Sequence, residues 1–253
     1  MSFKQGSSVY RYCMDVKERH GAGFFVLIDP DRTSQDKVTD HAQRCQDSGV
    51  DAILIGTSLM MGDGFDEYVD AARQNIDIPI ILFPGNKSQV TGKADAILFL
   101  SLFSGRNPEL IIGEQVKSAP LIRSIELEAI STAYLLIESG RLTSVEYMLN
   151  TKPIPSDKPE ITVAHAMTAE MFGMKMVYLE AGSGAARPVP VDMIRDVVSA
   201  VSIPVIAGGG IRSPETVKEI VNAGASFVVV GNHLEKSDNL CDLKSFVQAA
   251  HFK

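Results

Sequence analysis

The chain has 253 residues, of which 45% are hydrophobic and 22% are charged, and its formal net charge is -7. These values are typical of one globular domain, and we expect a single domain over residues 1–253. The acidic balance argues against general nucleic-acid binding, which requires Lys and Arg to neutralise phosphates. No apolar run approaches the roughly 20 residues that cross a bilayer, which leaves at most peripheral membrane contact.

The three cysteines, Cys13, Cys45 and Cys241, are odd in number and widely spaced. They match neither the ligand spacing of a zinc site nor a disulfide framework. Free thiols persist in a reducing compartment, and the N-terminus lacks the apolar core of a signal peptide. We therefore expect a cytoplasmic protein.

Short runs rich in Val, Ile and Leu alternate with segments of helical periodicity along the whole chain. This alternation indicates parallel βαβ units. The predicted strands lie near residues 23–29, 51–56, 79–83, 94–100, 133–138, 176–180, 204–207 and 226–230. Eight such strands with helices between them predict an α/β fold of the (β/α)8 class, a TIM barrel.

Helix boundaries have recognisable start and stop residues. Thr33, with Asp36 three residues later, predicts the start of the first helix between strands. A helix over residues 159–172 is expected to end at Gly173. Ser213, followed by proline and glutamate, predicts the start of the helix that precedes the last strand.

Three segments depart from the regular pattern. Residues 84–93 are short and polar, so we expect a loop in place of the helix between strands three and four. Residues 139–159 form a long connection of the kind that usually contributes to function in this fold. The apolar run 97–103 is longer than a buried strand, and we favour a core strand plus a first helical turn over a hydrocarbon groove.

The last three strands break into glycine where each strand is expected to end. Gly208, Gly209 and Gly210 follow the seventh strand, and Gly231 follows the eighth. Glycine lets backbone N–H groups approach an anion closely, and this fold commonly binds phosphate at these loops. We predict a phosphate cradle here, beside Asn232, which could cap a helix or donate to the same anion.

Glu180 ends the sixth strand at a site otherwise suited to negative charge. Side chains alternate along a strand, so Val177 and Leu179 should face the helices. Tyr178 and Glu180 then point toward the barrel axis and mouth. We favour a proton-transfer role for Glu180, and a structural salt bridge is the alternative.

The first strand ends in Asp29, whose backbone is restricted by the proline that follows. A carboxylate there is well placed for a hard cation such as Mg2+, and Thr57 and Ser58 add hydroxyl oxygens after the second strand. The alternative is helix capping by Asp31 or Thr33.

Several strings occur together and in order: Leu27-Ile-Asp-Pro-Asp31, Ile55-Gly-Thr-Ser58, Lys152-Pro-Ile-Pro155, Tyr178-Leu-Glu-Ala-Gly-Ser-Gly184, Gly208-Gly-Gly-Ile211 and Gly231-Asn232. With them the chain resembles the geranylgeranylglyceryl phosphate synthase family of prenyltransferases along nearly its whole length. The resemblance implies Mg2+-dependent transfer of a geranylgeranyl group from its diphosphate to the 3-hydroxyl of sn-glycerol 1-phosphate. It also implies a homo-oligomer, either a dimer or a hexamer.

The resemblance assigns roles to residues that match the family's motifs. Glu180 and Tyr178 are the expected catalytic residues, and Asp29 and Ser58 the expected magnesium ligands. The residues expected to bind glycerol phosphate are Tyr178, Leu179, Glu180, Ala181, Gly182, Ser183, Gly184, Gly209, Gly210, Gly231 and Asn232.

Three alternatives remain open at this point. A heptaprenylglyceryl phosphate synthase would use a longer donor. A phosphate-binding barrel isomerase or cyclase would need an acid/base pair on strands one and five, where only Asp29 and Glu138 are available. A non-catalytic metabolite-binding barrel would give no reason for Glu180.

Overall fold

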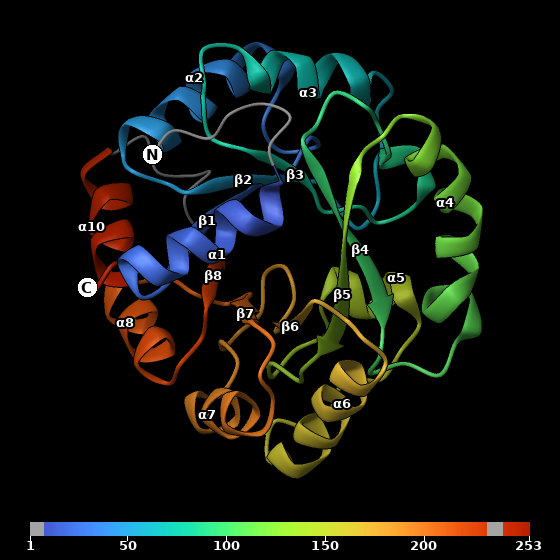
Figure 1. Ribbon diagram of the computed structural model, residues 1–253, viewed down its shortest axis with the longest axis vertical. Coiled ribbons are helices and arrows are strands. Elements are labelled where there is room, and N and C mark those ends of the chain that lie inside the picture. Colours follow the sequence, from blue (N-terminus) through green and yellow to red (C-terminus); the bar gives the residue numbers. More distant parts are fainter. Residues whose placement is uncertain (1–7, 232–239) are drawn as a thin grey trace.

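The computed structural model describes residues 8–231 and 240–253. Eight parallel strands form a closed barrel in sequence order, which confirms the predicted fold (Figure 1). The strands are β1 (Gly23–Ile28), β2 (Ala52–Ile55), β3 (Ile80–Leu82), β4 (Ala96–Leu102), β5 (Glu128–Leu136), β6 (Met176–Glu180), β7 (Val205–Gly208) and β8 (Phe227–Val230).

Helices surround the barrel and cover its outer face (Figure 1). They are α2 (Gln35–Asp47), α3 (Phe65–Arg73), α4 (Glu114–Ser124), α5 (Ser144–Leu149), α6 (Pro159–Met171), α7 (Val191–Ala200), α8 (Pro214–Asn222) and α10 (Leu240–Ala250). One π-helical turn, η2 (Glu109–Gly113), leads directly into α4.

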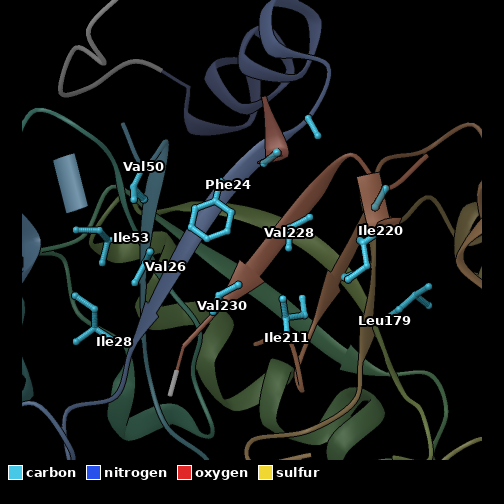
Figure 2. Packing of buried hydrophobic residues seen from close by; sticks show 14 of the residues in the cluster. Phe24, Val26, Ile28, Val50, Ile53, Leu179, Ile211, Ile220, Val228 and Val230 are labelled. Carbon is cyan, nitrogen blue, oxygen red and sulfur yellow. The ribbon is translucent and has the colours of Figure 1, made fainter. Parts of the chain in front are cut away.

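The strands are apolar on both faces because each face packs on a different layer. Val177 and Leu179 join the shell between barrel and helices, which Figure 2 shows around Phe24, Val228 and Ile220. Met176 and Tyr178 instead belong to the cluster that fills the barrel interior. The alternation predicted for β6 is therefore confirmed.

A helix that the sequence pattern did not suggest, α1 (Val9–His20), packs on the barrel interior from one end. Its buried Val9 and Cys13 join the interior cluster with Phe25 and Phe227. Glu128 fixes the start of α1, because its carboxylate accepts hydrogen bonds from the Val9 N–H at 2.5 Å and the Ser8 hydroxyl at 2.9 Å. A carboxylate at a helix N-terminus is stabilised by the exposed N–H groups there.

The start of β5 is the largest error in the predicted strand boundaries. β5 begins at Glu128, five residues before the predicted start at Ala133. Ser131 and Thr132, in the first half of β5, are polar, and they interrupt the apolar pattern by which a strand is recognised in the sequence. Their partners are backbone groups, such as the Ile130 carbonyl that accepts from the Thr132 hydroxyl at 2.9 Å.

The irregular third connection is confirmed. Between β3 and β4 lies one 3-10 turn, η1 (Lys87–Gln89), in place of a covering helix. The apolar run 97–103 forms a strand as expected, but the expected helical turn is wrong, because β4 continues to Leu102.

The helix-boundary signals differ in accuracy. α2 has Ser34 rather than Thr33 at its N-cap. α6 ends before Gly173 as predicted, and Ser213 caps α8 by accepting from the Thr216 N–H at 3.3 Å.

Within the described part of the chain, no helix is both long and apolar enough to cross a membrane.

Candidate active site

A large cavity of about 1130 Å³ lies at the end of the barrel where the strands terminate. The carboxyl ends of the strands carry the active site in this fold. The lining comes from the ends of β1 to β8 and from the connections that follow them. It has three distinct parts: a glycine-rich part, a part with carboxylate and hydroxyl oxygens, and an apolar arm.

The glycine-rich part is formed by the connections after β6, β7 and β8. Gly182, Gly184, Gly209 and Gly210 line the cavity and have φ values of 97°, 75°, 82° and 70°, which side chains rarely tolerate. Gly231 lines the same part. Of the predicted cradle residues, Gly209, Gly210 and Gly231 are therefore brought together at the cavity, whereas Gly208 ends β7 and is not part of the cavity wall. Asn232 lies outside the described residues.

Not every residue of the Tyr178–Gly184 string faces the cavity. Leu179 and Ala181 are buried in the shell toward the helices and are absent from the cavity wall. The Ala181 N–H donates to the Gly208 carbonyl at 3.0 Å, so it supports the link between β6 and β7. Ser183 and Gly184 line the cavity.

Glu180 lies on the cavity wall and is only 6% exposed. Its Oε1 accepts a hydrogen bond from the Gly182 N–H at 2.6 Å. Burial raises the pKa of this carboxyl to about 7, while the Gly182 N–H and the Tyr178 hydroxyl lower it less strongly. Among the described residues Glu180 has no salt bridge, so they offer no support for the alternative of a structural ion pair.

Two glycines of β7 and its loop make room for the catalytic candidates. A Cβ atom at Gly208 would lie 2.4 Å from the Tyr178 hydroxyl. A Cβ atom at Gly209 would lie 2.4 Å from Oε1 of Glu180. The lack of side chains at Gly208 and Gly209 therefore leaves space for Tyr178 and Glu180 of the neighbouring strand β6. It also lets an anion approach the backbone.

Tyr178 belongs to a group of three aromatic residues beside Glu180. Its ring stacks on Phe83 with centroids 5.2 Å apart, and Tyr134 lies 5.7 Å from it. Burial, and then the Glu180 charge, raise the pKa of both tyrosines well above 10. Both hydroxyls therefore stay protonated near neutral pH.

The oxygen-donor part is formed by the ends of β1 and β2. Asp29 Oδ2 accepts from the Thr57 hydroxyl at 3.3 Å and lies 3.3 Å from Nε of Arg32. Ser58 follows Thr57, and all four residues line the cavity. Burial raises the pKa of Asp29, although the Asp31 N–H and Arg32 oppose this shift. Neither Asp31 nor Thr33 is the N-cap of α2, since Ser34 has that position.

These donors are compatible with Mg2+. A partly desolvated carboxylate beside hydroxyl oxygens is a hard-oxygen donor set that gains from a nearby cation. The described residues hold no group of three or more His, Cys, Asp or Glu that could bind a metal unaided. A single carboxylate suits Mg2+ because this ion often takes its other ligands from water and substrate phosphates.

The apolar arm extends along β4 toward η2 and α4. It is lined by Ile97, Leu98, Phe99, Leu100, Leu102, Leu110 and Ile122. Residues 97–100 and 102 therefore do line a groove, which was the less favoured prediction from the sequence.

The long connection after β5 contributes residues that sequence reasoning missed. Thr143 is buried against Gly182, where a Cβ atom would lie 2.6 Å from the Thr143 hydroxyl. This contact places Arg141 over the cradle, with a guanidinium nitrogen 3.1 Å from the Cβ position of Gly184. Arg212 lines the same part and donates to the Ala185 carbonyl at 2.7 Å. The length of the connection after β5 indicated a functional segment, but it could not indicate which of its residues, such as Arg141 and Thr143, lie at the cavity.

A barrel with a glycine cradle, a buried carboxylate beside it and oxygen donors opposite belongs to the class of phosphate-binding (β/α)8-barrel enzymes. The model of the PcrB family matches residues 14–250. Geranylgeranylglyceryl phosphate synthase from Chitinophaga pinensis is 46% identical over 97% of this chain and 96% of its own length. The enzyme of that name from Pyrococcus furiosus is 42% identical over 85% and 86%. The chain belongs to the PcrB family.

A solved structure extends the similarity to three dimensions. (S)-3-O-geranylgeranylglyceryl phosphate synthase from Thermoplasma acidophilum, in complex with its substrate sn-glycerol-1-phosphate, superposes with a TM-score of 0.91. The two chains are 33% identical, and the match covers 97% of this chain and 99% of the other. Family and fold are thus the same along the whole barrel.

The raised pKa of Glu180 predicts a specific dependence of stability on pH. The folded-state pKa of about 7 exceeds the ordinary value of 4.5, so the folded state loses stability as pH rises from 4.5 through 7. Glu180→Gln removes this penalty and should raise the free energy of unfolding at pH 8 by on the order of 3 kcal/mol, with little change at pH 4.

Urea denaturation of wild type and variant between pH 4 and pH 9 measures this difference. Glu219→Gln on α8 is the control, since Glu219 is exposed and should leave the pH profile unchanged. Parallel stability curves for wild type and Glu180→Gln would show that the carboxyl is not desolvated.

Proposed function

We propose that this protein is a prenyltransferase that joins geranylgeranyl diphosphate to the 3-hydroxyl of sn-glycerol 1-phosphate through an ether bond. The observation that carries the proposal is one continuous cavity that joins a glycine cradle, a buried carboxylate and an apolar arm. The cradle suits the phosphate of a small polar acceptor, and the arm suits a hydrocarbon chain. The sn-glycerol-1-phosphate complex of the Thermoplasma acidophilum relative supports the identity of the acceptor.

Glu180 takes the proton from the acceptor. The glycerol oxygen attacks the first carbon of the prenyl chain while the bond from that carbon to the diphosphate oxygen breaks. Pyrophosphate leaves, and the hydroxyl proton passes to the Glu180 carboxylate. A pKa of about 7 makes this carboxylate a stronger base than an ordinary glutamate while leaving it substantially ionised at neutral pH.

Mg2+ is the proposed cofactor, held by Asp29 and Ser58 together with oxygens of the diphosphate. When bound, it neutralises the charge that develops on the leaving group. Asp29 is oriented by the Thr57 hydroxyl, and Arg32 beside it adds positive charge at the same end of the cavity. In this proposal the leaving group would lie across the cavity from the glycine cradle.

The aromatic group between the two ends suits the allylic carbon that becomes positive during transfer. Phe83, Tyr134 and Tyr178 all line the cavity. The faces of aromatic rings attract cations, and the attraction is stronger where water is excluded. Beyond them the arm along β4 supports the chain, at roughly 0.8 kcal/mol for each CH2 that it buries.

The donor chain and the oligomeric state are proposed from the family resemblance. Geranylgeranyl is the proposed donor chain, and a heptaprenyl donor is the alternative because the arm accepts a hydrocarbon of unspecified length. Assembly as a homo-oligomer, either a dimer or a hexamer, stays a prediction.

A product assay tests the function directly. Purified protein receives Mg2+, sn-glycerol 1-phosphate or its 3-phosphate enantiomer, and prenyl diphosphates of graded length, and products are identified by mass spectrometry. We expect a geranylgeranyl ether from the 1-phosphate only. A preferred heptaprenyl product would select the alternative donor, and no ether with any donor would refute the prenyltransferase assignment.

Glu180→Gln should bind sn-glycerol 1-phosphate with an affinity close to that of wild type, because the cradle remains intact. Turnover should fall by roughly 10²–10⁴-fold, the usual contribution of general acid–base catalysis. Isothermal titration gives the affinity, and the product assay gives the rate. Survival of most of the turnover would exclude Glu180 as the proton acceptor.

Asp29→Asn should raise the Mg2+ concentration needed for half-maximal activity, since a neutral amide is a weaker ligand for a hard cation than a carboxylate. Its KM for sn-glycerol 1-phosphate should stay near the wild-type value, because the cradle lies on other strands. Activity measured over a series of Mg2+ concentrations decides the assignment, and an unchanged titration curve would remove it.

A further inference from the structure

The 3-10 turn that replaces the third helix contains one completely buried polar side chain. Gln89 is 0% exposed, although the three residues directly before it, Asn86, Lys87 and Ser88, are exposed. A buried amide is costly unless its oxygen and nitrogen both find hydrogen-bond partners. The hydrogen-bond partners of Gln89 therefore show which part of the protein holds the 3-10 turn η1 in place.

Those partners lie on the connection after β2, 32 residues away in sequence. Oε1 of Gln89 accepts from the Thr57 N–H at 3.0 Å, and Nε2 donates to the Thr57 carbonyl at 2.9 Å. The side chain thus holds both backbone groups of one residue, as a neighbouring strand would. Oε1 also accepts from the Gly85 N–H at 3.4 Å, so the same side chain is bonded to the connection after β3.

The backbones of the connections after β2 and β3 lie closer together than any residue with a side chain would allow. A Cβ atom at Gly56 would lie 1.9 Å from the Phe83 carbonyl oxygen, and one at Gly85 would lie 2.4 Å from the Thr57 carbonyl oxygen. Glycine at both positions lets the backbones meet, and Gln89 joins them. These contacts continue the pairing of β2 and β3 beyond the last regular residues of the strands.

Thr57 is the residue that connects this arrangement to the chemistry. Its hydroxyl donates to Oδ2 of Asp29 at 3.3 Å, and its backbone leads directly into Ser58. Gln89 itself is not part of the cavity wall, although Thr57 and Gly85, which it holds, both line the cavity. We infer that Gln89 is a positioning residue, which fixes Thr57 and Ser58 so that Asp29 and Ser58 present their oxygens to Mg2+ and diphosphate.

The inference rests on the proposed function, because it assumes that Mg2+ and diphosphate bind at Asp29 and Ser58. It also gives the shortened third connection a second role. Phe83, Pro84, Asn86, Lys87 and Val90 of the same connection line the cavity. A single segment therefore lines the cavity and orients the residues at its metal end.

The first test measures binding without turnover. Gln89→Leu retains the approximate volume of the side chain but removes all three hydrogen bonds, and Gln89→Met is a second variant should the branched side chain prevent folding. Isothermal titration with inorganic pyrophosphate and Mg2+ should show affinity lowered by roughly 10–100-fold, as for other residues that orient metal ligands. Hydrogen exchange of residues 56–61 should become faster, since the Thr57 N–H loses its acceptor.

The matched control is Gln46→Leu. Oε1 of Gln46 also accepts from backbone N–H groups of a neighbouring connection, those of Asp77 and of Ile78 at 3.3 Å, but before β3 at the opposite end of the barrel. Both substitutions should lower the melting temperature. Only Gln89→Leu should shift pyrophosphate affinity and the Mg2+ half-saturation of the reaction, with KM for sn-glycerol 1-phosphate unchanged within about twofold.

Unchanged pyrophosphate affinity in folded Gln89 variants would overturn the inference, and so would an equal loss in Gln46→Leu. An equal rise in KM for sn-glycerol 1-phosphate would also overturn it, because it would indicate general loosening of the barrel. Failure of wild type itself to bind Mg2+ and pyrophosphate is a separate outcome, which refutes the proposed metal site.

Discussion

The constraint on which the site depends is the burial of the Glu180 carboxylate at the barrel mouth. Desolvation makes this group basic enough to accept a proton near neutral pH, and it also makes the folded state less stable above that pH. The cost is limited by a short hydrogen bond from the Gly182 N–H. Gly209 is required as well, because any side chain there would collide with the carboxylate. One glycine-rich surface thus makes room for the buried carboxylate and lines the proposed phosphate site.

The cavity separates opposite electrostatic requirements onto different strands. The connections after β6, β7 and β8 offer backbone and arginine groups to an anion, whereas the ends of β1 and β2 offer oxygens to a cation. The closed barrel holds these two sides at a fixed distance. A reaction that joins a phosphate-bearing acceptor to a diphosphate-bearing donor needs such a separation, since effective alignment of two substrates can contribute as much as any single group.

The 3-10 turn that replaces a regular third helix affects both the cavity wall and the attachment of the neighbouring loops. The connection from Phe83 to Val90 lies against the cavity, where a full helix would cover the barrel instead. A shortened connection alone would leave the loops after β2 and β3 weakly held. The glycine contacts and the Gln89 side chain replace the missing helical packing with direct backbone attachment.

The sequence by itself determined the barrel, seven of its strands to within about two residues, the missing helix and the inward direction of Tyr178 and Glu180. These follow from local patterns: apolar alternation, glycine at strand ends and the shortage of helix formers in residues 84–93. Local patterns failed for β5, where the polar residues Ser131 and Thr132 find backbone partners, and for α1, whose start depends on the remote Glu128.

Only the tertiary structure decided the pKa of Glu180, the placement of Arg141 over the cradle and the partners of Gln89. Each depends on residues far apart in sequence that the closed barrel brings into contact. Burial of a carboxylate is a property of its surroundings, and a glutamine in a polar segment gives no sign of the backbone it will bind. The chemical groups are therefore readable from the chain, whereas their strengths and orientations result from packing.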